Sequence, residues 1–217
     1  MDQELKNSIL KTGTTILGIV CKDGIVMASD RQVTAGQSFV SSKKFKKTNQ
    51  INDYLVVSWA GNLSDAQRLS KLIAAELKLK ELRAKSRPTV KQSANLVASI
   101  SYSNIRQPSM IPSIVGTMIG GFNEDGSFEI YSIGPDGSII QVDDYNATGS
   151  GMVFVIGLLE RQYKEGLSIK EGVELAKESL KSSTQRDVFS GYGIDVFVIT
   201  KEGIKKVTDQ EIKSEFK

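Results

Sequence analysis

The stretch Gly13-Thr14-Thr15-Ile16-Leu17-Gly18-Ile19 places a junction of small residues directly before an apolar, β-branched run. Such a run is typical of a buried β-strand. If the chain were cut between Gly13 and Thr14, the new first residue would carry a hydroxyl group and a free α-amine. An amine can act as the base for a neighbouring hydroxyl, so one residue would supply both nucleophile and base. The junction is therefore either the plain start of a strand or the centre of a catalytic site.

The composition indicates a globular protein of the cytosol. The chain has 217 residues, of which 40% are hydrophobic and 24% are charged, a profile typical of one domain of this length or of two small ones. No apolar run approaches the roughly 18 residues of a membrane span, and the first residues lack the pattern of a secretory signal. The single cysteine, Cys21, excludes a disulfide framework and fits a reducing compartment. We therefore predict a cytoplasmic protein with no membrane partner.

The charged residues narrow the function further. A net charge of +3 is too small to indicate a nucleic-acid partner, and the basic run at 43–47 is either a phosphate-binding patch or a solvated strand edge. The chain has no histidine, which excludes Ser-His and Cys-His nucleophile pairs and the usual zinc sites. Hydrolytic chemistry would have to use a lysine, an α-amine or paired carboxylates as its base. We expect neither a metal nor a cofactor.

Strand and helix signals alternate along the chain in blocks. Strands are predicted from 14 to 60, followed by two helices at 62–84 and 89–105, where apolar residues recur with a period near 3.6. More strands follow between 113 and 142, and then two helices at 152–164 and 168–184, the second opened by a Ser168–Glu171 capping box. A hairpin is predicted at 194–207, and the same capping-box spacing at Thr208 and Glu211 predicts a short terminal helix.

This order of elements predicts an α+β fold built from antiparallel sheets. The strands at 14–22 and 25–30 are almost continuously apolar, which indicates that both of their faces are buried. Two such sheets can pack face to face if a pair of helices covers each outer face. We therefore expect a four-layer α-β-β-α sandwich, with two antiparallel sheets between helix pairs.

Several short motifs, each different from the others, follow one another along the chain. They are Gly13-Thr14-Thr15-Ile16, Ala28-Ser29-Asp30-Arg31, Val33-Thr34-Ala35-Gly36, Lys46-Lys47, Ala60-Gly61, Asp65-Ala66-Gln67, Gly149-Ser150-Gly151, Arg186-Asp187, Ser190-Gly191 and Ile194-Asp195-Val196. In this order, from about Thr12 to the C-terminal region, the chain resembles archaeal-type 20S proteasome β subunits. These belong to the Ntn-hydrolase family of N-terminal threonine proteases. The resemblance implies a leader at 1–13 that the chain removes autocatalytically, followed by a single protease domain at 14–217.

The resemblance also implies roles for residues at the matching positions. Thr14 would be the nucleophile, exposed by cleavage after Gly13, and Asp30 and Lys47 would be its charged partners. The choice of Lys47 over Lys46 assumes one extra residue between 37 and 45. The α-amine of Thr14 would have a pKa of about 8, close to working pH. The ammonium of Lys47 beside the hydroxyl would favour the alkoxide form of Thr14.

Four further positions complete the implied site. Ser150, Asp187 and Ser190 would hold the new N-terminus, and the backbone N–H of Gly61 would stabilise the oxyanion. Thr34 and Trp59 would bind substrate. Family members have the floor of the substrate side-chain pocket at the position of Trp59, so its indole would favour small side chains or block cleavage. Trp59 is alternatively a core tryptophan that merely shortens the pocket.

The resemblance implies a catalytic β subunit, a threonine endopeptidase that hydrolyses unfolded proteins. Its partners would be proteasome α subunits and other β subunits in stacked heptameric rings, with a regulatory ATPase. A different class of function remains open beside this one. A β-type ring subunit could keep its leader and act structurally, with little or no activity of its own.

Overall fold

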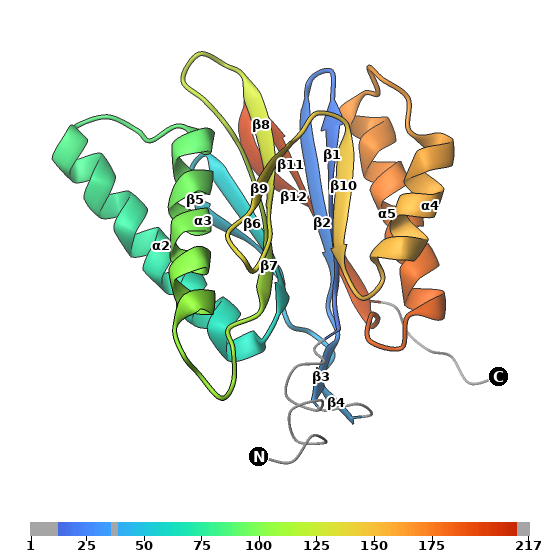
Figure 1. Cartoon of the computed structure of the whole chain (residues 1–217). Helices are drawn as coiled ribbons and strands as arrows, with labels where there is room; N and C mark the ends of the chain where they lie inside the picture. Colours follow the sequence, from blue (N-terminus) through green and yellow to red (C-terminus); the bar gives the residue numbers. More distant parts are fainter. Residues whose placement is uncertain (1–12, 36–38, 212–217) are drawn as a thin grey trace.

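Two five-stranded antiparallel sheets face each other in the computed structural model, which describes residues 13–35 and 39–211 (Figure 1). The first sheet has the strand order β10 (Tyr145–Gly149), β1 (Thr15–Cys21), β2 (Gly24–Asp30), β11 (Gly193–Thr200) and β12 (Gly203–Glu211). The second sheet has the order β5 (Thr48–Asn52), β6 (Leu55–Gly61), β7 (Val115–Phe122), β8 (Phe128–Ile133) and β9 (Ile139–Val142). A small two-stranded sheet, β3 (Val33–Ala35) with β4 (Phe39–Ser42), projects from one end of the sandwich.

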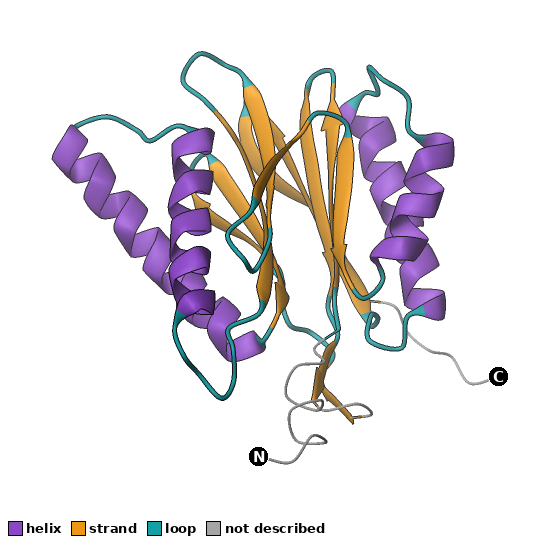
Figure 2. Ribbon diagram, in the orientation of Figure 1, coloured by secondary structure: helices purple, strands orange, loops and turns teal. Residues whose placement is uncertain are grey.

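A pair of helices covers each outer face, as Figure 2 shows. The helices α2 (Leu63–Ala84) and α3 (Val90–Arg106) lie on the second sheet, and α4 (Met152–Gln162) and α5 (Ile169–Arg186) lie on the first. The predicted four-layer α-β-β-α sandwich is therefore confirmed. None of the helices in the described part of the chain is both long and apolar enough to span a membrane.

Three buried apolar clusters fill the spaces between the layers. Successive side chains of a strand point to opposite faces, and β1 shows this directly. Ile16 joins the cluster between the sheets with Met27 and Met118, whereas Leu17 and Ile19 join the cluster under α4 and α5. A third cluster lies between the second sheet and α2 and α3. The apolar first strands are thus buried on both faces, as their sequences predict.

The helices begin at the caps that the sequence indicates. The side chain of Asn62 accepts hydrogen bonds from the backbone N–H groups of Ser64 and Asp65 at the start of α2. Thr89 opens α3 with a capping box, and Ser168 opens α5 in the same way with Glu171. Each cap satisfies backbone N–H groups that have no partner inside the helix.

Two elements differ from the sequence prediction. The terminal helix predicted at Thr208 and Glu211 is wrong, because β12 continues to Glu211 and pairs with β11, with Val196 opposite Thr208. The hydrogen bonds of this long ladder outweigh a local capping signal. Strand β10 was not predicted from its polar sequence, and it forms by pairing with β1, with Thr15 opposite Gly149.

The register of the strands brings several strand ends to one end of the sandwich. In the first sheet, Thr15 lies opposite Gly149, and Asp30 lies opposite Ile194. In the second sheet, the last residue of β6, Gly61, lies opposite the first residue of β7. Residues far apart in sequence therefore meet where β1 begins.

Candidate active site

The carboxylate of Asp30 is the centre of a buried polar cluster at this end of the sandwich. It is completely buried at the end of β2 and accepts four hydrogen bonds. Oδ1 receives the backbone N–H of Thr15 and the Nζ of Lys47, both at 2.8 Å. Oδ2 receives the backbone N–H groups of Gln32 at 2.9 Å and Gly191 at 3.1 Å. Charge-assisted bonds of this kind hold a carboxylate firmly in place.

Lys47 lies just before β5 and carries the positive charge of the cluster. Its side chain is 4% exposed and forms an ion pair with Asp30, whereas the neighbouring Lys46 is exposed. Burial lowers the pKa of Lys47 from its ordinary value, and the negative charge of Asp30 opposes that shift. The ion pair also joins the first sheet to the segment that opens the second.

The Gly13–Thr14 junction lies against this ion pair. Both residues are buried. The Thr14 hydroxyl donates a 2.5 Å hydrogen bond to the carbonyl oxygen of Gly13, and Lys47 Nζ donates to the same oxygen at 3.4 Å. A hydroxyl and an ammonium therefore meet at the one peptide carbonyl that precedes Thr14.

A second group of side chains surrounds the nitrogen of Thr14. Its backbone N–H donates to Ser150 Oγ at 3.1 Å, and Ser150 Oγ donates to Asp187 Oδ2 at 2.6 Å. Ser190 Oγ donates to the same oxygen at 2.7 Å. The hydroxyls of Ser190 and Thr15 lie 2.7 Å apart, which links this group to the start of β1. Of the residues that the sequence singles out, the structure thus brings together Thr14, Asp30, Lys47, Ser150, Asp187 and Ser190.

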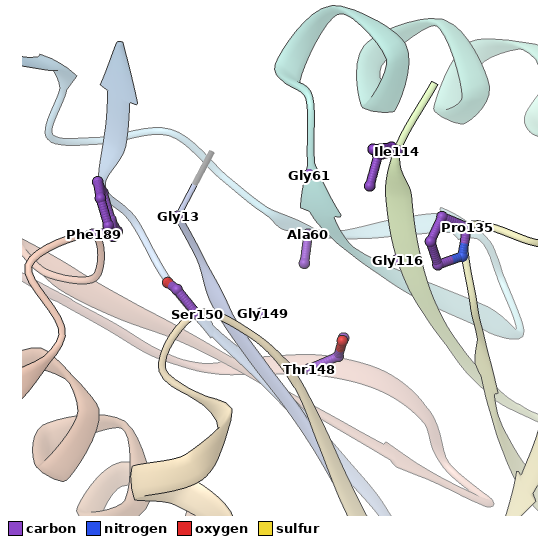
Figure 3. A pocket seen from close by; sticks show the side chains of 10 residues that line it. All are labelled: Gly13, Ala60, Gly61, Ile114, Gly116, Pro135, Thr148, Gly149, Ser150 and Phe189. Carbon is purple, nitrogen blue, oxygen red and sulfur yellow. The ribbon is translucent and has the colours of Figure 1, made fainter. Parts of the chain in front are cut away.

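A cavity of about 370 Å³ opens beside the junction (Figure 3). Its lining comes from both sheets and the loops between them, and consists of Gly13, Ala60, Gly61, Ile114, Gly116, Pro135, Thr148, Gly149, Ser150 and Phe189. Figure 3 shows Phe189 on one side of Gly13, with Ala60 and Gly61 on the other. Gly61 has a φ of +142°, and a β-carbon there would lie 2.2 Å from the carbonyl oxygen of Ile114. Only glycine fits this position at the cavity wall without strain.

The two residues implied to bind substrate lie outside this lining. Trp59 is 5% exposed and packs in the cluster between the second sheet and α2, with Ala66 and Leu69. Thr34 is also buried, and its hydroxyl accepts a 2.9 Å hydrogen bond from the side-chain amide of Gln32. Their roles toward a substrate stay predictions.

Sequence reasoning missed several groups of the cluster. Thr15 takes part through both its backbone N–H and its hydroxyl, and Gln32 and Gly191 take part through their backbone N–H groups. Backbone donors leave no signal in residue type, although Gly191 directly follows Ser190 in the motif. Phe189 lies in the same loop, and its contact with Gly13 depends on the fold alone.

Comparisons with known proteins identify the family of the chain. The family model described as "Proteasome subunit" matches residues 10–199. A protein of Methanosarcina mazei named "Proteasome subunit beta" is 41% identical over 202 residues, which are 93% of each chain. Proteins of the same name are 39% identical in Nanoarchaeum equitans and 37% identical in Methanopyrus kandleri. The alignment with the Nanoarchaeum equitans protein covers 89% of this chain and 96% of that protein. The alignment with the Methanopyrus kandleri protein covers 94% of this chain and 95% of that protein. The chain therefore belongs to the proteasome subunit family, as a β-type member.

Proposed function

We propose that this chain is a threonine endopeptidase of a proteasome core, which removes its own leader and then hydrolyses unfolded proteins. One observation carries the proposal. The Thr14 hydroxyl and the Lys47 ammonium both contact the carbonyl oxygen of Gly13, inside a cluster anchored by Asp30. A nucleophile, a cation and a single peptide bond thus meet in a buried site, which suits attack on that bond.

In the first reaction, Thr14 Oγ attacks the carbonyl carbon of Gly13. The carbonyl oxygen becomes an oxyanion, and the nearby Lys47 ammonium stabilises its charge. The bond between that carbon and the Thr14 nitrogen then breaks, and the hydroxyl proton ends on the nitrogen. Water hydrolyses the resulting ester, which releases the leader with a free carboxyl group and restores the hydroxyl.

The second reaction uses the amine that the first one creates. The α-amine of Thr14 takes the proton from its own hydroxyl as Oγ attacks the carbonyl of a peptide substrate, and gives it to the leaving amine. Water then hydrolyses the acyl-enzyme. Ser150, which already accepts a hydrogen bond from the nitrogen of Thr14 in the uncut chain, orients the amine, and Asp187 holds the Ser150 hydroxyl in place. The N-terminal threonine is a recognised variant of the nucleophile–base pair.

The proposal extends to the assembly. As a β-type family member, the chain would form rings with other β subunits, stacked on rings of α subunits, in the cytoplasm. A regulatory ATPase would deliver unfolded proteins to the enclosed sites. In this setting Trp59 and Thr34 would contribute to substrate binding.

Replacement of Thr14 by alanine tests the proposal. The full-length chain is expressed with α-type partner subunits, and its intact mass is measured in the assembled particle together with peptide hydrolysis. The parent is expected to begin at Thr14 and to hydrolyse peptides, whereas Thr14→Ala should keep residues 1–13 and show no hydrolysis. A parent chain that stays full-length in the assembled particle would refute the proposal and favour a structural ring subunit.

A further inference from the structure

The side of Gly13 that faces the loop after α5 has no room for a side chain. A β-carbon built at position 13 would lie 1.6 Å from Cβ, 2.4 Å from Cγ and 2.9 Å from Cα of Phe189. Carbon atoms that are not bonded to each other never approach this closely, so one of the two segments would have to shift. Figure 3 shows the Phe189 side chain beside Gly13 at the rim of the cavity.

This overlap cannot be relieved by turning the phenyl ring away. The closest contact is with Cβ of Phe189, and Cβ is fixed by the backbone whatever rotamer the ring adopts. Relief therefore requires a backbone shift, either of this loop or of the segment at Gly13. The loop can move only by giving up hydrogen bonds. It is held on both sides of Phe189: the carbonyl oxygen of Val188 accepts a 2.8 Å hydrogen bond from Gln32, and Ser190 Oγ donates to Asp187.

A shift of this loop would disturb the rest of the cluster as well. The backbone N–H of Phe189 donates to Asp187 Oδ1 at 3.2 Å, and Asp187 Oδ2 receives the hydroxyl of Ser150. The N–H of Gly191, two residues further, binds Asp30. If a side chain at position 13 pushed Phe189 outward, the partners of the Thr14 nitrogen and of Lys47 would move with it.

We propose that Phe189 is the residue that restricts position 13 to glycine, and so sets the sequence requirement for self-cleavage of this chain. The inference rests on the proposed self-cleavage, in which the carbonyl of residue 13 is attacked. Phe189 touches the residue on the acyl side of the broken bond and takes no part in proton transfer. It is therefore a specificity-determining residue.

The first test compares rates of leader removal in the full-length chain assembled with α-type partners. Gly13→Ala should slow the appearance of the mass that begins at Thr14 by about a hundredfold, because small displacements of reacting groups have effects of this size. Gly13→Ala with Phe189→Gly removes the clashing β-carbon and should recover at least about tenfold of that loss. Gly13→Ala with Phe189→Ala keeps the β-carbon and should stay slow.

A matched control separates the steric effect from added loop flexibility. Val188→Gly introduces the same backbone freedom one residue earlier, at a side chain that is 75% exposed, and leaves Cβ of Phe189 in place. Combined with Gly13→Ala, it should give no recovery. Equal recovery with Val188→Gly, no recovery with Phe189→Gly, or fast cleavage of Gly13→Ala alone would each overturn the inference.

A second measurement does not depend on cleavage. In a Thr14→Ala background, Gly13→Ala should lower the melting temperature by about 5 °C, an overpacking effect, and should lower it much less when Phe189 is also glycine. A parent chain that is never cut refutes the proposed function, and with it the requirement for self-cleavage. The melting temperatures then test by themselves whether Phe189 excludes a side chain at position 13. If Gly13→Ala lowers the melting temperature equally with phenylalanine and with glycine at position 189, that exclusion is overturned.

Discussion

Replacing Asp30 by asparagine changes a side chain that accepts four hydrogen bonds and balances a buried ammonium. One of the two oxygens becomes an NH₂ group, which cannot accept a hydrogen bond. If the remaining oxygen keeps Thr15 and Lys47, the NH₂ group faces the backbone N–H groups of Gln32 and Gly191. With the opposite orientation the NH₂ group faces the backbone N–H of Thr15 and the ammonium of Lys47. In either orientation, two donors lose their acceptor.

The expected cost follows from these losses. Removing one partner of a buried ion pair costs about 3–5 kcal/mol, because the other charge stays buried. A buried donor without a partner costs about 1–3 kcal/mol, although these costs do not add fully. We therefore expect Asp30→Asn to lower the free energy of unfolding by at least about 3–5 kcal/mol, a large part of the roughly 5–15 kcal/mol of a typical domain. The melting temperature should fall by about 6–20 °C.

Denaturant unfolding of the full-length chain, followed by circular dichroism, measures this cost. Lys78→Met is the matched control, because it breaks an ion pair with Glu81 of similar length, 3.1 Å, in which the side chains are 66% and 41% exposed. Such surface pairs contribute at most about 1 kcal/mol. The control should therefore unfold almost like the parent.

Lys47→Met tests the reasoning from the other side of the pair. It leaves Asp30 with three backbone N–H donors, from Thr15, Gln32 and Gly191, so the carboxylate stays solvated by the protein. We expect a smaller loss of about 1–3 kcal/mol. The account is refuted if Lys47→Met costs as much as Asp30→Asn, or if Asp30→Asn lies within about 1 kcal/mol of the parent.

Three further changes test other parts of the structure. Gly61→Ala should lower the free energy of unfolding by at least about 2 kcal/mol, since alanine disfavours the positive φ and its β-carbon meets a backbone oxygen; unfolding at the same denaturant concentration as the parent would contradict this. Ser150→Ala removes the acceptor of the Thr14 N–H and a donor to Asp187. The proposed leader removal, measured by intact mass, should therefore slow about tenfold to a hundredfold, and an unchanged rate would count against the role of Ser150. Burial raises the pKa of Cys21 to about 12, helped by nearby carboxylates. Because the thiolate is the reactive form, iodoacetamide at pH 8 should leave the folded chain unlabelled and the proposed peptidase activity intact. Rapid labelling or loss of that activity would contradict the burial of this thiol.

The layers of the fold are predictable from the sequence because they depend on local periodicity. Each of these signals lies within the element that it specifies or next to it. Examples are the apolar runs of β1 and β2 and the helix caps at Asn62, Thr89 and Ser168. Strands β10 and β12 are different, because each is stabilised by pairing with a strand that lies elsewhere in the sequence. Their own residues are polar or carry a competing helix signal.

The candidate site likewise contains residues that can be predicted from the sequence and residues that cannot. The charged and hydroxyl side chains can be selected from residue type and motif order, and the fold brings Asp30, Lys47 and Ser150 to the Gly13–Thr14 junction. The backbone donors and the contact between Phe189 and Gly13 cannot be selected in this way, because they depend on where two distant segments meet. For Trp59 the sequence leaves two interpretations, and the structure places its side chain in the core next to α2.

The hydrogen bonds at the start of β1 also say when this site can exist. Thr14 binds Ser150, which lies 136 residues further along the chain, and Thr15 binds Ser190, which lies 175 residues further. During synthesis at about 5–20 residues per second, the ribosome needs about 7–35 s to cross these two intervals. Throughout that time the N-terminal segment has been made, but the partners that complete its environment have not. Assembly of the cluster is therefore among the last events in the production of each molecule.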